Sequence, residues 1–330
     1  MKKKILLIVF TMCFLLTTGC FGNGSKNVTK SFKKKVEKAK NYYLTGELEI
    51  INNEDSYLYD VNVSYKDDDF FRVSLKNKTN DHEQIILKNE EGVYVLTPSL
   101  NKSFKFQSEW PYNNSQSYLL QTLVSDIEND KDKKIKENKD GYIVTTTVNY
   151  SNNKNLVKQK IYFNKKSMVE KVEVIDSDGN IKIKMTFNEI DMDAKFDDDY
   201  FKLDMNMSST EAQSTSKEIE DIIYPMYMPE NTYLASEDKV SLEDGERVIL
   251  TFLGDSPFTI IEETVTVDKQ IETINMSGEP MMLIDTIGSV SDNSITWISN
   301  GIEYYATSET LNDTELLEVV KSISVMPVGK

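Results

Sequence analysis

Very few residues of this sequence have the side-chain chemistry that catalysis or metal binding needs. The 330-residue chain has one histidine, His82, and two cysteines, Cys13 and Cys20. His82 stands in the polar run Asn80-Asp81-His82-Glu83 without a serine or cysteine nucleophile nearby, and we interpret it as a surface histidine. Metal clusters of His and Cys are therefore excluded, and little material is left for a catalytic triad. We predict no catalytic residue, no metal site and no cofactor.

The acidic residues are numerous but show no spacing typical of a site. Two triplets, Asp67-Asp68-Asp69 and Asp197-Asp198-Asp199, offer oxygens suited to calcium. Neither has the EF-hand spacing with glycine at the sixth position, so we interpret both as solvated turns. The 54 Asp and Glu residues include no pair that sequence spacing marks out for glycoside hydrolysis. The hypothesis that this chain is a hydrolase therefore has no candidate catalytic residues.

The first twenty residues have the layout of a bacterial lipoprotein signal. Lysines at positions 2–4 precede an apolar stretch from Ile5 to Leu16. That stretch is shorter than the roughly 20 residues of a membrane span and is typical of a secretory signal peptide. Gly19 then precedes Cys20, which resembles the lipobox, where cleavage leaves an acylated cysteine as residue one. We predict a signal peptide over 1–19 and a lipid anchor at Cys20 on the extracytoplasmic face of the cytoplasmic membrane; the alternative is an ordinary signal peptide with an incidental cysteine.

The net charge excludes nucleic acid as a partner and is unevenly distributed. The formal charge is −16, whereas binding to phosphates needs a surplus of Lys and Arg. Residues 26–40 nevertheless carry seven lysines against Glu37. The apolar residues of this region recur at helical spacing, which predicts an amphipathic helix over 28–43 that packs on the core; they are Val28, Phe32, Val36, Ala39 and Tyr43. Its lysines either lie on anionic headgroups or form a solvated helix face.

Alternation of apolar and polar side chains predicts a long antiparallel sheet after this helix. In 59–65 the odd positions are apolar and the even positions polar, as in a half-buried strand. Asp178-Gly179 predicts a tight hairpin turn, and 115–129 has the apolar stripe of a helix. Further strands are predicted at 70–75, 84–87, 93–96, 100–106, 141–150, 156–163, 168–176 and 181–188. The first domain thus covers 28–205, after a lipidated tether at 20–27.

A second, smaller α+β domain is predicted after a linker. Residues 206–218 contain no large apolar residue after Met207, which is typical of linkers. A last helix over 314–323 follows Asn312, which can form a capping box with Glu315. Strands are predicted at 247–253, 258–267, 281–287, 294–299 and 302–307. The fold class is therefore α+β, with a second domain at 219–330.

The first domain resembles the LolA-like lipoprotein-carrier fold. Four segments look like the pattern of that superfamily, in which a strand, a tight turn and a second strand are followed by a final F-x-x-x-x-F motif. The segments are Ile161–Lys166, Val169–Val172, Ile181–Asn188 and Phe196–Phe201. The resemblance covers roughly 28–205. It implies a curved antiparallel sheet, a half-barrel, with helices that cover its concave side.

The second domain is similar to a small uncharacterised module of Firmicutes envelope and sporulation proteins. The resemblance is carried by Pro225–Pro229, the hairpin Trp297–Tyr304 and the closing helix Leu316–Ile323. This module often follows a LolA-like domain in lipoproteins related to sporulation and spore germination. The pairing implies a lipoprotein of that type.

Three functions remain open from the sequence. A curved sheet with covering helices can leave an apolar cavity, which strand aromatics line or fill; examples are Tyr59, Tyr65, Phe71 and Phe104. Because each aromatic buries about 150–250 Å², we expect filling, and hence a non-catalytic binding or scaffold protein of the envelope, linked to sporulation or germination. Its partner would be an envelope protein or a hydrophobic ligand, at residues that the sequence does not identify. The alternatives are a carrier of lipoprotein acyl chains or other hydrophobic ligands and, second, a cell-wall hydrolase.

Overall fold

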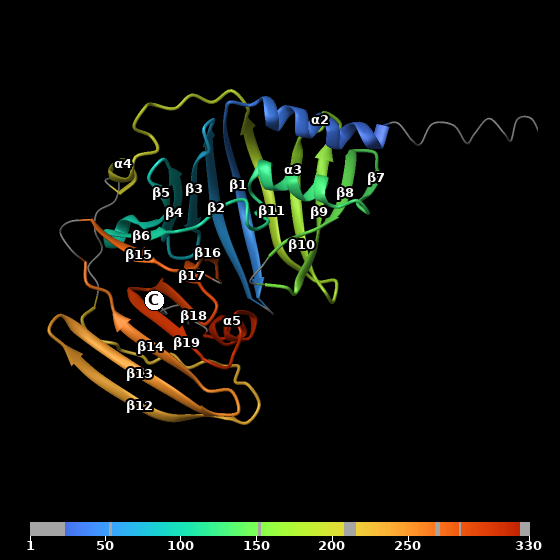
Figure 1. Ribbon diagram of the computed structural model, residues 1–330. Helices are drawn as coiled ribbons and strands as arrows, with labels where there is room; N and C mark the ends of the chain where they lie inside the picture. The colour runs from blue at the N-terminus through green and yellow to red at the C-terminus, as the bar shows by residue number, and fades with distance from the viewer. Residues whose placement is uncertain are drawn as a thin grey trace, which may run out of the picture.

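The computed structural model in Figure 1 describes residues 24–52, 55–150, 153–207, 216–267, 271–283 and 285–323. The predicted signal peptide at 1–19, the predicted lipid-attachment residue Cys20 and residues 208–215 of the predicted linker lie outside these ranges. About half of the described residues belong to the strands of two sheets, and few belong to helices. The predicted α+β class is confirmed.

The larger sheet curves around one side of the molecule and has twelve strands, in the order β15-β6-β5-β4-β3-β2-β1-β11-β10-β9-β8-β7. All neighbours are antiparallel except β15 and β6, which run parallel. The strands are β1 (Asn41–Asn52), β2 (Asp55–Lys66), β3 (Phe70–Asn77), β4 (Glu83–Asn89), β5 (Gly92–Thr97), β6 (Lys102–Phe106), β7 (Lys134–Glu137), β8 (Gly141–Thr147), β9 (Leu156–Asn164), β10 (Val169–Asp176), β11 (Ile181–Asp191) and β15 (Glu272–Met276). The predicted curved sheet is confirmed, and a short 3₁₀ turn, η1 (Pro98–Leu100), precedes β6.

Two helices lie together over one end of this sheet (Figure 1). Helix α2 (Gly24–Lys38) buries Val28, Phe32 and Val36, and α3 (Leu120–Asn129) lies beside it. The prediction that the first helix extends to residue 43 is wrong. From Asn41 onward alternate side chains are buried, which is the two-residue period of a strand. The predicted start of α3 at 115 is also wrong, because 115–119 form a turn in which Ser115 Oγ donates to Asp126 Oδ1 at 2.9 Å.

The smaller sheet has seven strands, in the order β12-β13-β14-β19-β18-β17-β16. They are β12 (Thr232–Leu242), β13 (Gly245–Gly254), β14 (Phe258–Thr264), β16 (Glu279–Met282), β17 (Ile287–Val290), β18 (Ser294–Ser299) and β19 (Ile302–Thr307). Helix α5 (Asp313–Lys321) packs on β18 and β19 and begins with the predicted Asn312–Glu315 capping box. The predicted single strand over 281–287 is wrong, because Leu283 N donates to Thr286 O at 2.8 Å in a turn between β16 and β17.

The aromatic segment at the end of the first domain packs on the outer face of the large sheet. Phe196 and Phe201 contact each other, with ring centroids 5.3 Å apart, ahead of helix α4 (Leu203–Met207). They pack on a small cluster with Ile85, Leu87 and Tyr94 of β4 and β5. Residues 196–207 therefore cover the β4–β5 part of the face that α2 and α3 do not cover.

One strand and one buried amide are among the contacts that join the two sheets, together with Ile287 and Ile298, which pack in the core of the first domain. Strand β15 comes from the C-terminal part of the chain yet pairs with β6 of the large sheet. Gln84 of β4 is 4% exposed, and its Oε1 accepts hydrogen bonds from Ile287 N at 2.6 Å and Thr286 Oγ1 at 3.0 Å. The C-terminal part is thus fixed against the edge and end of the large sheet, and the division of the chain at 206–218 stays a prediction.

Candidate functional site

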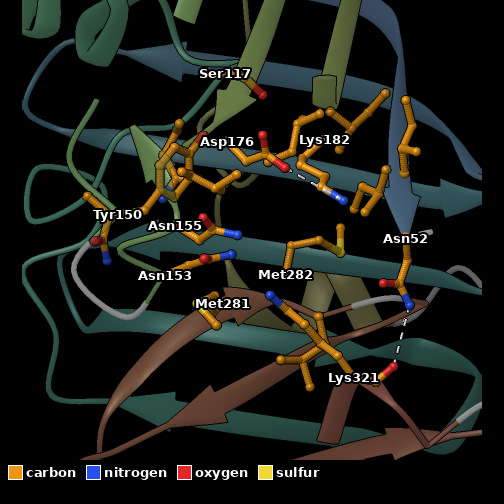
Figure 2. Close-up of a pocket in the computed structure, with 18 of the residues that line it drawn as sticks. Asn52, Ser117, Tyr150, Asn153, Asn155, Asp176, Lys182, Met281, Met282 and Lys321 are labelled. Carbon is orange, nitrogen blue, oxygen red and sulfur yellow. Dashed lines mark hydrogen bonds and ion pairs between the residues drawn. The ribbon is translucent and has the colours of Figure 1, made fainter. Parts of the chain in front are cut away.

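A pocket of about 460 Å³ lies where the end of the large sheet meets the C-terminal part of the chain. We call it the junction pocket, lined on one side by the ends of β1, β9, β10 and β11, and on the other by β16 and α5 (Figure 2). Its lining residues come from segments as far apart in the chain as Leu48 and Ser322. The pocket therefore exists only in the assembled chain.

The lining of the junction pocket is half apolar and half polar. Apolar side chains come from the sheet, at Ile50, Leu156 and Ile183, and from β16, at Met281 and Met282. Carboxamide side chains surround them from several loops and strand ends; they are Asn52, Asn114, Gln116, Asn153, Asn155 and Asn180. Such a lining combines apolar contact with groups that both donate and accept hydrogen bonds.

The β10–β11 hairpin supplies the charged side chains of one wall. It turns at Gly179, which has φ of +93°, and the carboxylate of Asp176 accepts hydrogen bonds from Asp178 N at 3.0 Å and Asn180 N at 2.8 Å. Lys182 Nζ lies 3.8 Å from Asp176 Oδ2. Burial acts to raise the pKa of Asp176, but the hydrogen bonds from Asn180 and the charge of Lys182 hold the pKa below its ordinary value.

The opposite wall carries a lysine without an acidic partner. Lys321 stands in the last turn of α5, and Figure 2 shows its ammonium group pointing into the junction pocket while its backbone oxygen accepts a hydrogen bond from Asn52 Nδ2 at 3.4 Å. Burial lowers the pKa of Lys321, and the charge of Lys182 lowers it further, while Glu318 acts in the opposite direction. Among the described residues, no carboxylate lies within salt-bridge distance of its Nζ. The ammonium is thus free to meet an anionic group of a ligand.

The concave face of the large sheet is filled beneath α2 and α3, whereas the junction pocket occupies another part of the same face, where Leu48, Ile86 and Leu156 line it. Tyr59, Phe71 and Trp110 are almost fully buried, and the rings of Phe71 and Trp110 meet edge to face with centroids 5.7 Å apart. Phe104 is also buried, while the half-buried Tyr65 stacks on Tyr42 at 5.2 Å. The expectation that strand aromatics fill the core is confirmed.

A second pocket, also of about 460 Å³, lies between the C-terminal ends of α2 and α3. Most of its lining residues are polar or charged, among them Glu37, Lys40 and Glu128. It lacks the apolar wall of the junction pocket.

The carboxyl groups with strongly raised pKa lie away from the junction pocket. Burial raises the pKa of Asp126 to about 6 and that of Glu262 to about 7. Asp126 accepts hydrogen bonds from Ser115 and Gln159 inside the first domain, whereas Glu262 is buried in the core of the smaller sheet. The two acids lie in separate cores, so they cannot act together as the acid and base of a glycosidase.

The polar residues that the sequence singled out do not converge. His82 is half-buried rather than on the surface, and burial lowers its pKa. Asp67-Asp68-Asp69 and Asp197-Asp198-Asp199 form turns in which the first two residues of each triplet are exposed. Within the described ranges, no group of three or more His, Cys, Asp or Glu side chains is placed to hold a metal ion. The same ranges contain no helix with the length and apolarity of a membrane span.

Comparisons with known proteins agree with the expected family. A model of the family "Sporulation protein YdcC-like" matches residues 2–201. The chain is 34% identical over 327 residues to sporulation protein YdcC of Bacillus subtilis (strain 168), covering 98% of this chain and 97% of that protein.

Solved structures similar to the chain are more distant. One is the complex of Pseudomonas aeruginosa MucA and MucB, with 12% identity, 90% of this chain and 98% of that chain covered, and a TM-score of 0.35. Another is a LolA-superfamily protein of Nitrosomonas europaea, with 10% identity, 55% and 98% covered, and a TM-score of 0.32. Likeness at this level says nothing about function.

Proposed function

On the premise that the chain belongs to the family of YdcC-like sporulation proteins, we propose that it is a lipid-anchored, non-catalytic binding protein of the cell envelope. Acylation of Cys20 holds it on the extracytoplasmic face of the cytoplasmic membrane. A segment of a protein partner binds in the junction pocket, and this contact is the protein's contribution to sporulation or germination.

The N-terminal sequence supports the anchor. Cys20 stands four residues before the start of α2 at Gly24, so the lipid and the folded chain are joined by a very short tether. Two acyl chains anchor a protein stably, where one chain alone is marginal. This arrangement favours permanent attachment over a carrier that leaves the membrane.

The filled part of the concave face, beneath α2 and α3, is the observation that carries the binding role over the carrier role. An acyl carrier needs an apolar cavity between its sheet and its helices, but Tyr42, Phe71, Trp110 and Leu120 occupy that space and are 0–1% exposed. The junction pocket, by contrast, is surrounded by carboxamide groups, which match the donors and acceptors of a peptide better than a hydrocarbon chain.

The charges of the pocket support a partner segment that carries a carboxylate. Lys321 presents an ammonium group that no described carboxylate pairs, and Lys182 shares Asp176 with two backbone N–H groups. A ligand carboxylate would therefore gain a charge-assisted hydrogen bond that the chain itself does not supply.

The hydrolase alternative is weaker for a geometric reason. Asp176 lines the pocket with a lowered pKa, whereas a general acid for glycoside hydrolysis needs a raised one. The acids whose pKa values burial raises, Asp126, Glu262, Asp285 and Glu303, do not line the pocket.

The proposal is tested by filling the pocket. Met282→Trp adds bulk to the wall contributed by β16, and Met205→Trp on α4, at a side chain that is 52% exposed, is the matched control. The native lipoprotein and both variants are purified from sporulating cells, and co-purifying proteins and lipids are identified by mass spectrometry. We expect a protein partner with the native chain and with Met205→Trp, and its loss with Met282→Trp.

A second measurement distinguishes the carrier alternative. The signal-free, unacylated chain is titrated with a fluorescent fatty-acid probe. Saturable one-to-one binding at micromolar affinity that Met282→Trp abolishes would contradict the protein-partner role and support the carrier.

A further inference from the structure

The outer face of helix α2 carries a stripe of unpaired lysines. Lys30, Lys34 and Lys38 follow one another at four-residue spacing, which places them on one side of the helix, and all three are exposed. The buried stripe of Val28, Phe32 and Val36 precedes them by two positions, so the lysines face directly away from the core. Among the described residues, none of the three lysines forms a salt bridge or a side-chain hydrogen bond.

A neighbouring turn extends this stripe. Lys35 Nζ donates a hydrogen bond to the backbone oxygen of Lys166, which holds the β9–β10 turn beside α2. Lys165 and Lys166 in that turn are exposed. We call these five residues, Lys30, Lys34, Lys38, Lys165 and Lys166, the basic face.

Two acids that lie near α2 are paired with a lysine outside this face. Glu37 and Glu128 both lie within salt-bridge distance of Lys33, at 3.4 and 2.5 Å. Their charges are therefore offset by a lysine that is not part of the basic face.

The opposite end of the molecule is strongly acidic. Residues 219–330 contain 21 Asp and Glu against five Lys and Arg. Their net charge of −16 equals that of the whole chain. Strand β1 begins three residues after α2 and ends at Asn52 in the junction pocket. Twelve residues of strand at about 3.4 Å each separate the two ends by roughly 35–40 Å.

We infer that the basic face binds the anionic headgroups of the bilayer and so fixes how the anchored protein stands on the membrane. The inference rests on the proposed anchor at Cys20, because a lipid four residues before α2 makes the bilayer the surface that this helix meets at high effective concentration. The acidic C-terminal part is then held several Debye lengths from the membrane, where repulsion by anionic lipid is screened. The junction pocket points away from the bilayer, toward partners in the space beyond it.

The test separates the basic face from the anchor by removing the lipid. The mature chain with Cys20→Ser is sedimented with vesicles of phosphatidylglycerol and phosphatidylcholine, and with vesicles of phosphatidylcholine alone, at low and high salt. We expect binding to the anionic vesicles only, and its loss at high salt. Replacing Lys30, Lys34 and Lys38 together by glutamine should weaken that binding by roughly 100-fold.

A matched triple variant controls for the change in net charge. Lys154, Lys158 and Lys217 are exposed and do not belong to α2 or to the β9–β10 turn; their replacement by glutamine should change vesicle affinity by less than about threefold. Equal weakening in both triple variants, or no binding to anionic vesicles at low salt, would overturn the basic face.

The anchor is tested independently in cells. Cys20→Ala should release the protein from membranes or leave it unprocessed. A variant that stays membrane-bound with the normal mature mass contradicts the anchor, and the vesicle result for the unacylated chain still decides the basic face.

Discussion

At the scale of single residues, Glu262 is the side chain whose environment conflicts most with its usual charge. It is 0% exposed, and its Oε1 accepts one hydrogen bond, from Ile223 N at 3.0 Å. Its Oε2 has no hydrogen-bond partner among the described residues. Burial raises the pKa of Glu262 to about 7, because the low-dielectric core disfavours the carboxylate.

This environment predicts a pH-dependent stability. Between about pH 4.5 and pH 7 the folded chain keeps a proton on Glu262 that the unfolded chain has lost, so the free energy of unfolding falls as pH rises through that window. Glu262→Gln keeps the acceptor for Ile223 and cannot ionise. We expect the variant to match the native chain near pH 5 and to exceed its stability at pH 8 by on the order of 2–3 kcal/mol, as measured by urea unfolding.

The adjacent residue provides the control. Glu263 forms a salt bridge with Arg247 at 2.5 Å and is only partly buried. Glu263→Gln should cost at most about 1 kcal/mol and leave the native pH dependence between pH 5 and pH 8 in place. If the difference in free energy of unfolding between Glu262→Gln and the native chain is the same at pH 5 and pH 8, the raised pKa of Glu262 is contradicted.

At the scale of elements, Gln84 of β4 supplies buried hydrogen bonds to β17 across the joint between the two sheets, beside the apolar contacts of Ile287 and Ile298. Gln84→Leu keeps the volume but leaves Ile287 N without its acceptor, at a cost of about 1–3 kcal/mol for a buried unpaired group. We expect faster hydrogen exchange across 285–290, measured by mass spectrometry, with little change on β9 and β10.

Gln159→Leu is the matched control for this joint. Gln159 is also buried and donates to Asp126 Oδ2 at 2.7 Å, inside the first domain. It should lower the overall stability by a similar amount without a selective effect on 285–290. Equal protection of that segment in both variants would show that Gln84 does not hold the joint.

The elements that the sequence predicted are those that bury one face. Alternation located β2, and the periodic apolar stripe located α2 and α5, because one buried face leaves a clear pattern. Strand β12 was missed since nine consecutive residues, Tyr233–Ser241, are exposed and no buried face imposes alternation. Strand β1 was missed since Ala39 and Tyr43 continue the helical spacing of α2 by chance.

The junction pocket could not be predicted for a different reason. Its walls join residues such as Ile50, Lys182 and Lys321, which are brought together only by the pairing of the large sheet and the docking of α5. A single sequence gives no signal for contacts over such separations when no motif marks them. The lipid-attachment prediction at Cys20 rests on local sequence context alone and stays a prediction.

At the scale of the whole molecule, the predicted linker and the observed joint together determine how the chain should respond to proteolysis. Lys217 is exposed, while Ile219 is buried, so local opening costs least just before residue 219. We expect trypsin to cut first within 206–218. The two fragments should remain associated in gel filtration and separate only in denaturant, because β15 and Gln84 still join them. A first cut inside 55–150, or fragments that separate at once, would contradict this organisation.

Strand β15, which comes from the C-terminal part of the chain, also affects the order in which the large sheet can form. The chain is synthesised from its N-terminus, so β6 is available long before Glu272–Met276, which lie 170 residues further along and complete the sheet. Until then β6 presents an open edge, which is a template for pairing with other chains, and contacts over such separations form slowly. We therefore expect the first 205 residues to depend on the later part of the chain, or on a helper that shields this edge, until folding is complete.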